Sequence, residues 1–484
     1  MLQRSDERGT GTLAIIGDIA DGLTRGVDAT VSTVSEAFFE PVIRLGVTGL
    51  SRAGKTVFIT SLVASLIGRS RMPGLLAAAE GRLSAAYLQP QPDNTVPRFS
   101  YEDHLAALTG PSPHWPDGTR RVSELRLSLR VAPSGLLAGL SGPRTVHLDI
   151  VDYPGEWLLD LGLLDKSFAD WSHAALERVV GREIAAPFRA AIDGVDGSAK
   201  LDETQARALA AAWTGYLSDA REAGLSDCTP GRFLLPGDLE GSPVLTFAPL
   251  PEAGDARRGS LYREFERRFE AYKREVVKPF FRDHFARIDR QIVLVDALGA
   301  IHGGPPAVDE MRTAMADILA AFRPGRNAFL TQLLLGRRVE KILFAATKAD
   351  HLHHSQHGRL TAIMEALVAE AKARADFAGA ETRALAMAAL RVTTEDEMDH
   401  EGRRLPVVRG ILQDTGKPAA FYPGDLPEDP SHLLSPARQG AERWLDGDFA
   451  AMRFAPRPLT LRPGEGPPHI RLDTAAQFLI GDRL

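Results

Sequence analysis

Gly49-Leu-Ser-Arg-Ala-Gly54-Lys55-Thr56 is the stretch of sequence that decides the fold. It fits the pattern G-x-x-x-x-G-K-S/T, follows a short apolar run at residues 42–48 and precedes apolar residues at helical spacing that end at Gly68. Phosphate oxygens need a concave row of backbone N–H donors, which glycines allow and which a helix N-terminus supports with its dipole. The stretch therefore predicts a strand, a phosphate-binding loop and a helix.

Residues of this loop have separate expected roles. Lys55 brings a positive charge to the outer phosphates, and Thr56 offers its hydroxyl to a magnesium ion. Arg52 lies inside the loop, where it acts either as an internal arginine finger or as an ordinary surface charge. The phosphate contacts are assigned to Gly49, Ser51, Arg52, Ala53, Gly54, Lys55, Thr56 and Val57.

Composition limits what surrounds this loop. The chain has 484 residues, several times the usual domain length, and is 44% hydrophobic and 25% charged, as soluble globular proteins are. Its net charge of −6 provides no general attraction to nucleic acid, and the single cysteine, Cys228, fits a reducing compartment. Because no stretch approaches the roughly 18 apolar residues of a membrane span, we expect a cytoplasmic protein without one.

The chain alternates between strand-like and helix-like patterns around the loop. Apolar strand patterns occur at residues 42–48, 122–131, 145–151, 292–295 and 342–346. They predict an α/β fold of the P-loop NTPase class, an open and largely parallel sheet with helices on both faces and with ligands bound beyond the strand carboxyl ends.

Five regions follow from these patterns. We expect an N-terminal helix in residues 1–40, which either docks on the body or binds a partner, and a first part of the core in 41–156 with an irregular insertion at about 70–120. A mainly helical insertion is expected at 157–286, the second part of the core at 287–400 and a C-terminal extension packed on the core at 401–484.

A second motif, Asp152-Tyr-Pro-Gly155, ends an apolar strand in a carboxylate and has the form D-x-x-G. Asp152 can hold the magnesium ion from its second shell, and the Gly155 N–H can meet the γ-phosphate; Asp149 is the rival acid but lies inside the strand. Glu156 follows where Ras-like GTPases have the glutamine that orients the attacking water. A catalytic role and a solvated carboxylate are both open for Glu156.

A third motif, Thr347-Lys-Ala-Asp350, follows the last predicted strand and matches the T-K-x-D form of a guanine site. One carboxylate can accept from both guanine N1–H and the exocyclic amine, a donor pair that adenine lacks, so Asp350 favours GTP over ATP. Lys348 would lay its aliphatic stem along the base. The histidines at 351, 353, 354 and 357 are interpreted as a polar loop beside this site and not as a metal pair.

A switch threonine that binds magnesium is expected between the first two motifs. Thr119, just before the strand at 122–131, is the preferred candidate, and Thr109 is the alternative. Arg120 and Arg121 flank Thr119 and are either arginine fingers or surface charges.

The chain resembles the YcjX-like family of P-loop proteins from Gram-negative bacteria. The resemblance rests on residues 46–61, 152–160, 230–236, 347–350, 468–473 and 478–484. It implies a Ras-like GTPase core with a helical insertion, a link to envelope stress and an integral inner-membrane partner. It also implies a third base-contacting segment, Ala389-Leu390-Arg391, in which the usual serine is missing.

Taken together, these motifs predict a protein that binds GTP and GDP with Mg²⁺, hydrolyses GTP slowly and acts as a switch. Expected catalytic residues are Lys55, Glu156, Thr119 and Arg52, and expected metal ligands are Thr56, Thr119 and Asp152. Further nucleotide contacts are assigned to Gly155, Thr347, Lys348, Asp350, Ala389 and Leu390. A nucleotide-bound scaffold with negligible hydrolysis and an ATPase are the alternatives.

Overall fold

The computed structural model describes residues 40–49, 52–118, 121–134, 142–225, 228–283, 287–320, 339–377, 379–444 and 449–484. Ser51, Thr119, Arg120 and the predicted N-terminal helix up to residue 39 lie outside the described residues.

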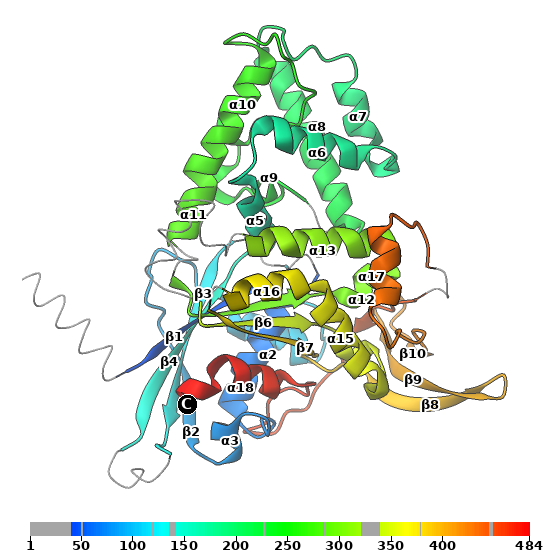
Figure 1. Ribbon diagram of the computed structural model, residues 1–484. Coiled ribbons are helices and arrows are strands. Elements are labelled where there is room, and N and C mark those ends of the chain that lie inside the picture. Colours follow the sequence, from blue (N-terminus) through cyan, green and yellow to red (C-terminus); the bar gives the residue numbers. More distant parts are fainter. Residues whose placement is uncertain are drawn as a thin grey trace, which may run out of the picture.

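A seven-stranded sheet forms the centre of the molecule, in the order β2-β3-β4-β1-β5-β6-β7 (Figure 1). Strands β4, β1, β5, β6 and β7 are parallel, whereas β3 and β2 are antiparallel to their neighbours. The bounds are β1 Val42–Gly49, β2 Leu83–Gln89, β3 Ser123–Val131, β4 Arg144–Asp152, β5 Arg290–Val295, β6 Lys341–Ala346 and β7 Glu381–Ala386. This architecture confirms the predicted α/β fold and each of the five predicted strands.

The register explains how motifs far apart in sequence come together. Val47 of β1 pairs with Asp152 at the end of β4, Gly49 pairs with Leu294 of β5, and Val295 pairs with Ala346 at the end of β6. Parallel strands end at the same edge of a sheet. The residues that come directly after β1, β4, β5 and β6 therefore all lie at the carboxyl edge of this sheet.

Helices cover both faces of the sheet and bury its apolar side chains. One face packs against α2 (Lys55–Gly68), α3 (Leu76–Ala79) and α18 (Leu472–Ile480). The opposite face packs against α12 (Ala297–His302), α13 (Pro305–Ala320), α15 (His357–Leu367) and α16 (Ala369–Phe377). Helix α2 is apolar nearly all round because it is buried on most of its surface. Figure 1 shows α18 and α13 on opposite sides of the strands.

A helical region follows β4 and rises above the sheet (Figure 1). It contains α5 (Glu156–Leu159), α6 (Phe168–Val179), α7 (Ala186–Ile192), α8 (Glu203–Glu222), α9 (Gly231–Leu234), α10 (Leu261–Tyr272) and α11 (Lys278–Asp283), and short 3-10 turns such as η1 (Asp160–Leu163). Its interior is aromatic: Trp171 stacks on Phe269 and meets Trp213 and Phe247 edge to face. These rings belong to the same apolar cluster as the sheet face that packs against α12, α13, α15 and α16.

Residues 70–120 differ from the irregular insertion that we predicted. They contain α3, the edge strand β2 and helix α4 (Tyr101–Thr109). Strand β2 reads Leu-Ser-Ala-Ala-Tyr-Leu-Gln, without a clear alternation, and it forms because its backbone pairs with β3 along residues 126–131. Pairing with a neighbour therefore overrode a weak local signal.

A second, antiparallel sheet lies beyond β7. It contains β8 (Thr394–His400), β9 (Arg403–Leu412), β10 (Pro418–Phe421) and β11 (Phe454–Ala455). Glu401 and Gly402 both have positive φ in the turn of the β8–β9 hairpin, which extends away from the body (Figure 1). Helix α17 (Ser431–Arg438) follows and packs against α13.

Candidate nucleotide-binding site

The phosphate loop joins the end of β1 to the start of α2. A Cβ atom at Gly49 would lie 2.6 Å from the Leu294 carbonyl oxygen, so only glycine fits there. Gly54 caps α2 with a φ of 84°, a conformation that glycine adopts without strain. Lys55 donates from Nζ to the Gly49 carbonyl oxygen at 2.9 Å. The lysine thus reaches back across the loop that carries it.

The other loop residues differ in exposure. Ala53 is buried in the core, and Val57 packs against a small cluster that includes Leu390. Arg52 is exposed and has a φ of 63°, which costs a non-glycine residue about 1 kcal/mol. The exposed guanidinium group is therefore available to a phosphate or to solvent.

Thr56 and Asp152 supply oxygen atoms beside the loop. Thr56 lies in the first turn of α2, and Asp152 ends β4, the strand next to β1. Both residues are buried. Because Mg²⁺ prefers hydroxyl and carboxylate oxygens, this donor set fits a magnesium ion held with a nucleotide.

Glu156 is buried and ion-paired, so its interpretation as a solvated carboxylate is wrong. Its side chain is 5% exposed, and Oε1 lies 3.0 Å from Nε of Arg221, on α8 of the helical region. The carboxylate that follows D-x-x-G is therefore tied to a helix 65 residues away in sequence.

Further contacts fix the segment after Gly155, the N-cap residue of α5, to residues 230–236. A Cβ atom at Gly231 would lie 2.1 Å from the Glu156 carbonyl oxygen, so glycine permits this close approach. Asp160 accepts from the Gly231 N–H at 2.7 Å and from the Tyr272 hydroxyl, and its complete burial raises its pKa to about 7. The Arg232 guanidinium stacks 3.2 Å from the centre of the Trp157 ring.

The T-K-x-D segment turns sharply after β6. Thr347 donates from its N–H to the Val295 carbonyl oxygen at 2.9 Å, and its hydroxyl lies 3.3 Å from the same atom. Lys348 has a φ of 61° and forms an ion pair with Asp296, the residue that follows β5. The motif is thus held to the neighbouring strand β5.

Asp350 is buried, with 3% of its surface exposed, and its position depends on residues some 40 places later. Its Oδ2 accepts from the Val392 N–H at 2.9 Å, and its backbone carbonyl accepts from the Thr393 hydroxyl. The carboxylate is therefore oriented before any base is bound.

The third predicted segment lies next to these residues. Ala389 is half-buried and Leu390 is buried. Ala388 exchanges two backbone hydrogen bonds with Ile470, at 3.0 and 2.8 Å, and Arg391 donates from its N–H to the Pro468 carbonyl oxygen at 2.7 Å. Backbone hydrogen bonds from the C-terminal segment at 468–473 therefore hold residues 388–391 in place.

Two of the switch candidates can be located. The Thr109 hydroxyl donates to the Leu105 carbonyl oxygen within α4, and Arg121 is exposed before β3. Thr119 and Arg120 lie outside the described residues.

Sequence reasoning missed four residues of this region: Arg221, Asp296, Val392 and Thr393. Asp296 had a signal, because it directly follows an apolar strand whose carboxyl end faces the site. Thr393 supplies a hydroxyl close to the segment that lacks the usual serine. Arg221 lies in an ordinary helical pattern, and nothing local marks it.

Comparison with known proteins shows the family of the chain. The family model described as YcjX-like family, DUF463, matches residues 43–484. A protein named Ras-like GTPase YcjX from Escherichia coli (strain K12) is 40% identical over 457 residues, which cover 91% of this chain and 96% of that protein. One of the same name from Shewanella oneidensis is 34% identical over 468 residues, covering 91% and 94%.

Helix length and hydropathy bear on membrane insertion. In the described part of the chain, none of the helices combines the length and the apolar character that crossing a bilayer requires.

Proposed function

The chain belongs to the YcjX-like family, and from that membership we propose that it binds GTP and GDP with Mg²⁺, hydrolyses GTP slowly and acts as a nucleotide-dependent switch. One observation carries the proposal. The phosphate loop, the D-x-x-G segment and the T-K-x-D segment follow β1, β4 and β6 at one edge of the sheet. The shared name of the two relatives, Ras-like GTPase, supports the choice of nucleotide.

Guanine selectivity would come from Asp350. Each carboxylate oxygen can accept two hydrogen bonds, so the bond from Val392 to Oδ2 leaves both oxygens able to accept from guanine N1–H and the exocyclic amine. On this edge, adenine has its exocyclic amine as a donor and N1 as an acceptor. One oxygen of the buried carboxylate would then face N1, which is unfavourable because neither atom can donate a hydrogen bond. Thr347, Lys348, Ala389 and Leu390 complete the proposed base pocket.

The phosphates would bind at the loop through residues 49–57. Lys55 Nζ would exchange its bond to the Gly49 carbonyl for charge-assisted bonds to the outer phosphates. Thr56, Thr119 and Asp152 would hold Mg²⁺, which neutralises charge on the phosphates when it is bound. The Gly155 N–H would report on the presence of the γ-phosphate.

Slow hydrolysis is part of this proposal, and the surroundings of the Glu156 carboxylate support it. The Arg221 guanidinium occupies one side of its carboxylate, and the negative charge would repel an approaching γ-phosphate. We therefore expect a rate on the order of 10⁻³ per second, as for unassisted Ras-like proteins, with Glu156 orienting water and Arg52 near the γ-phosphate.

The ion pair between Glu156 and Arg221 also favours a second candidate, a nucleotide-bound scaffold that scarcely hydrolyses GTP. Single-turnover measurement with GTP and Mg²⁺ separates the two candidates. Hydrolysis that completes within hours supports the switch, and GTP that remains intact supports the scaffold.

Competition titrations test the nucleotide itself. GDP and ADP are each titrated against the full chain with a fluorescent guanine nucleotide as reporter. We expect GDP to compete at concentrations at least about a hundredfold lower than ADP, as for a site built around a buried polar edge. Equal competition by ADP would refute the guanine assignment and favour the ATPase alternative.

At the level of the cell, we propose that the protein is cytoplasmic and reaches the inner membrane through an integral membrane partner during envelope stress. Family resemblance is the support for this step. Crosslinking in Gram-negative cells under envelope stress, with the Lys55→Ala variant beside the parent chain, would test it. Equal membrane recovery of both proteins would argue against nucleotide-dependent association.

A further inference from the structure

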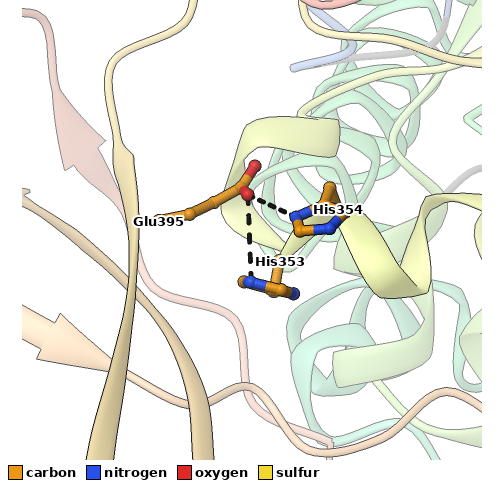
Figure 2. Close-up of side chains that lie close together, drawn as sticks. All are labelled: His353, His354 and Glu395. Carbon is orange, nitrogen blue, oxygen red and sulfur yellow. Dashed lines mark hydrogen bonds and ion pairs between the residues drawn. The ribbon is translucent and has the colours of Figure 1, made fainter.

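Two histidines and a glutamate meet beside the proposed base pocket (Figure 2). Nδ1 of His354 lies 2.6 Å from Oε2 of Glu395, and Nε2 of His353 lies 3.9 Å from the same oxygen. The ligand atoms of all three side chains lie within 4.8 Å of one another. In the described part of the chain, this is the one such group of metal-ligating side chains.

These histidines are not the pair with the i, i+4 spacing of a helical metal site, which would be His353 and His357. His357 begins α15 and is buried, with Nε2 at 2.7 Å from the Ala349 carbonyl oxygen, so it points into the fold. Glu395 comes from β8, on a segment 41 residues after His354. Only the tertiary fold supplies the carboxylate that the histidine tract lacks in sequence.

Neighbouring groups orient each candidate ligand. Nδ1 of His353 lies 2.9 Å from the Ser355 hydroxyl and 3.4 Å from the Ser355 N–H, and these contacts hold the ring with Nε2 toward Glu395. In the tautomer protonated at Nδ1, the hydroxyl accepts a hydrogen bond from Nδ1 and Nε2 can bind a metal ion. Arg391 donates to Oε1 of Glu395 at 3.1 Å, so Oε2 faces the histidines. The His354 side chain is 68% exposed, which leaves room for water to complete a coordination shell.

We propose that His353, His354 and Glu395 form a binding site for a divalent transition metal ion of the Zn²⁺ type, completed by water. Two imidazoles and one carboxylate are donors that suit Zn²⁺, whereas Mg²⁺ prefers oxygen ligands alone. Bond lengths of about 2.0–2.2 Å around zinc require ligand atoms about 3.3–3.6 Å apart in a tetrahedral site. The three side chains would have to rotate to reach these separations from the present 2.6 and 3.9 Å to Oε2 of Glu395.

The position of the site gives the metal ion a role, which rests on the proposed function. His353 lies three residues after Asp350, and Glu395 lies three residues after Val392, whose N–H orients the Asp350 carboxylate. A bound ion joins the two segments that hold this carboxylate. It therefore favours the arrangement that binds guanine, and zinc and GDP each raise the affinity for the other.

The site is tested first without nucleotide. Untagged full-length protein is titrated with Zn²⁺ and separately with Mg²⁺ by calorimetry. We expect one zinc ion per chain, an affinity lowered about tenfold or more in His354→Ala and in Glu395→Gln, and no Mg²⁺ binding at this site.

His173→Ala is the matched control, because His173 is also exposed and lies 3.2 Å from a carboxylate, that of Glu177. It should bind zinc as the parent chain does. Zinc binding that is absent from the parent chain, or equal in His354→Ala and the parent, overturns the site whether or not the protein binds GTP. Thermal unfolding of each variant shows that it is folded.

The coupling is tested by GDP titration with and without one equivalent of Zn²⁺. We expect zinc to tighten GDP binding about fivefold or more in the parent chain and to have no effect in His354→Ala. Zinc binding that leaves GDP affinity unchanged overturns the coupling. Failure of the parent chain to bind GDP at all overturns the proposed function instead, because the nucleotide-free titration does not depend on it.

Discussion

The two ends of the proposed nucleotide site are built in different ways. At the phosphate end, Lys55 reaches a carbonyl six residues earlier, and one continuous stretch forms the loop. At the base end, Asp350 is oriented by Val392 and Thr393, and their segment is braced in turn by residues 468–470. The loop that would hold the phosphates is therefore a local motif, whereas the base pocket requires distant segments to fold together.

The helical region adds to this contrast. It contacts the phosphate end through the ion pair between Glu156 and Arg221 and through Asp160. The base end contacts the antiparallel sheet and the C-terminal segment instead. The two ends of the proposed site are therefore held by different parts of the molecule.

The largest expected effect belongs to the local end. Lys55→Ala should weaken GTP binding by about 4 kcal/mol, because two or more charge-assisted bonds to phosphate are lost, and should leave thermal stability nearly unchanged. Nucleotide titration and thermal unfolding measure both. Lys417→Ala, which removes an exposed lysine, is the control and should bind like the parent. Normal GTP binding by Lys55→Ala would disprove the phosphate-loop assignment.

The base end is tested by Asp350→Asn. Its amide would face the exocyclic amine of guanine, so GDP should bind about 2–4 kcal/mol more weakly. Xanthosine diphosphate has an oxygen in place of that amine and should bind better than to the parent chain. The amide oxygen can still accept from Val392, so the local fold should persist. Competition titrations of both nucleotides measure this change in preference, and a retained preference for GDP would refute the guanine pocket.

The connection of the phosphate end to the helices is tested by pH. Burial raises the pKa of Asp160 from an ordinary value of 3.8 to about 7. Between these pH values the folded state therefore binds more protons than the unfolded state. The contribution of Asp160 to the free energy of unfolding is present at low pH and is lost as the pH rises through about 7.

Between about pH 5 and pH 8 this loss should amount to about 2–3 kcal/mol of unfolding free energy in the parent chain. Asp160→Asn should lack it, because an amide can accept from Gly231 and donate to the Tyr272 oxygen without titrating. Denaturant unfolding of both proteins at each pH isolates Asp160. Burial lowers the pKa of His351 and His357, which act with opposite sign in both proteins. Parallel pH profiles would refute the assignment.

The smallest expected effect concerns Glu156. If its carboxylate orients water, Glu156→Ala should lower the single-turnover rate about tenfold while GTP affinity changes little. Single-turnover hydrolysis at saturating protein measures the rate. An unchanged rate would confine Glu156 to its ion pair with Arg221, and the phosphate end would then contact the helices without using them in catalysis.

Most of the central sheet could be predicted from the sequence, and β2 shows where prediction failed. Buried parallel strands such as β5 and β6 are continuous apolar runs, which local patterns reveal. Strand β2 is a half-exposed edge strand, so its sequence has no clear strand pattern, and pairing with β3 decides its structure.

The same division applies to the site. Lys55, Asp152 and Asp350 could be named from the sequence because each follows a strand at a fixed spacing within a short motif. Arg221 and Glu395 could not, because neither an arginine within a helix nor a glutamate within an exposed, polar strand has a local feature that indicates its partner.

By itself, the sequence determined the α/β class, the family, the position of the phosphate-loop motif and the residues that we propose to face a guanine nucleotide. These properties depend on periodicity and on motifs in which the interacting groups are a few residues apart. Tertiary structure alone decided that Glu156 is buried against Arg221, that Val392 orients Asp350 and that Glu395 meets the two histidines. Each of these contacts joins residues about 40 or more positions apart, and their geometry exists only once the sheet and its loops have folded together.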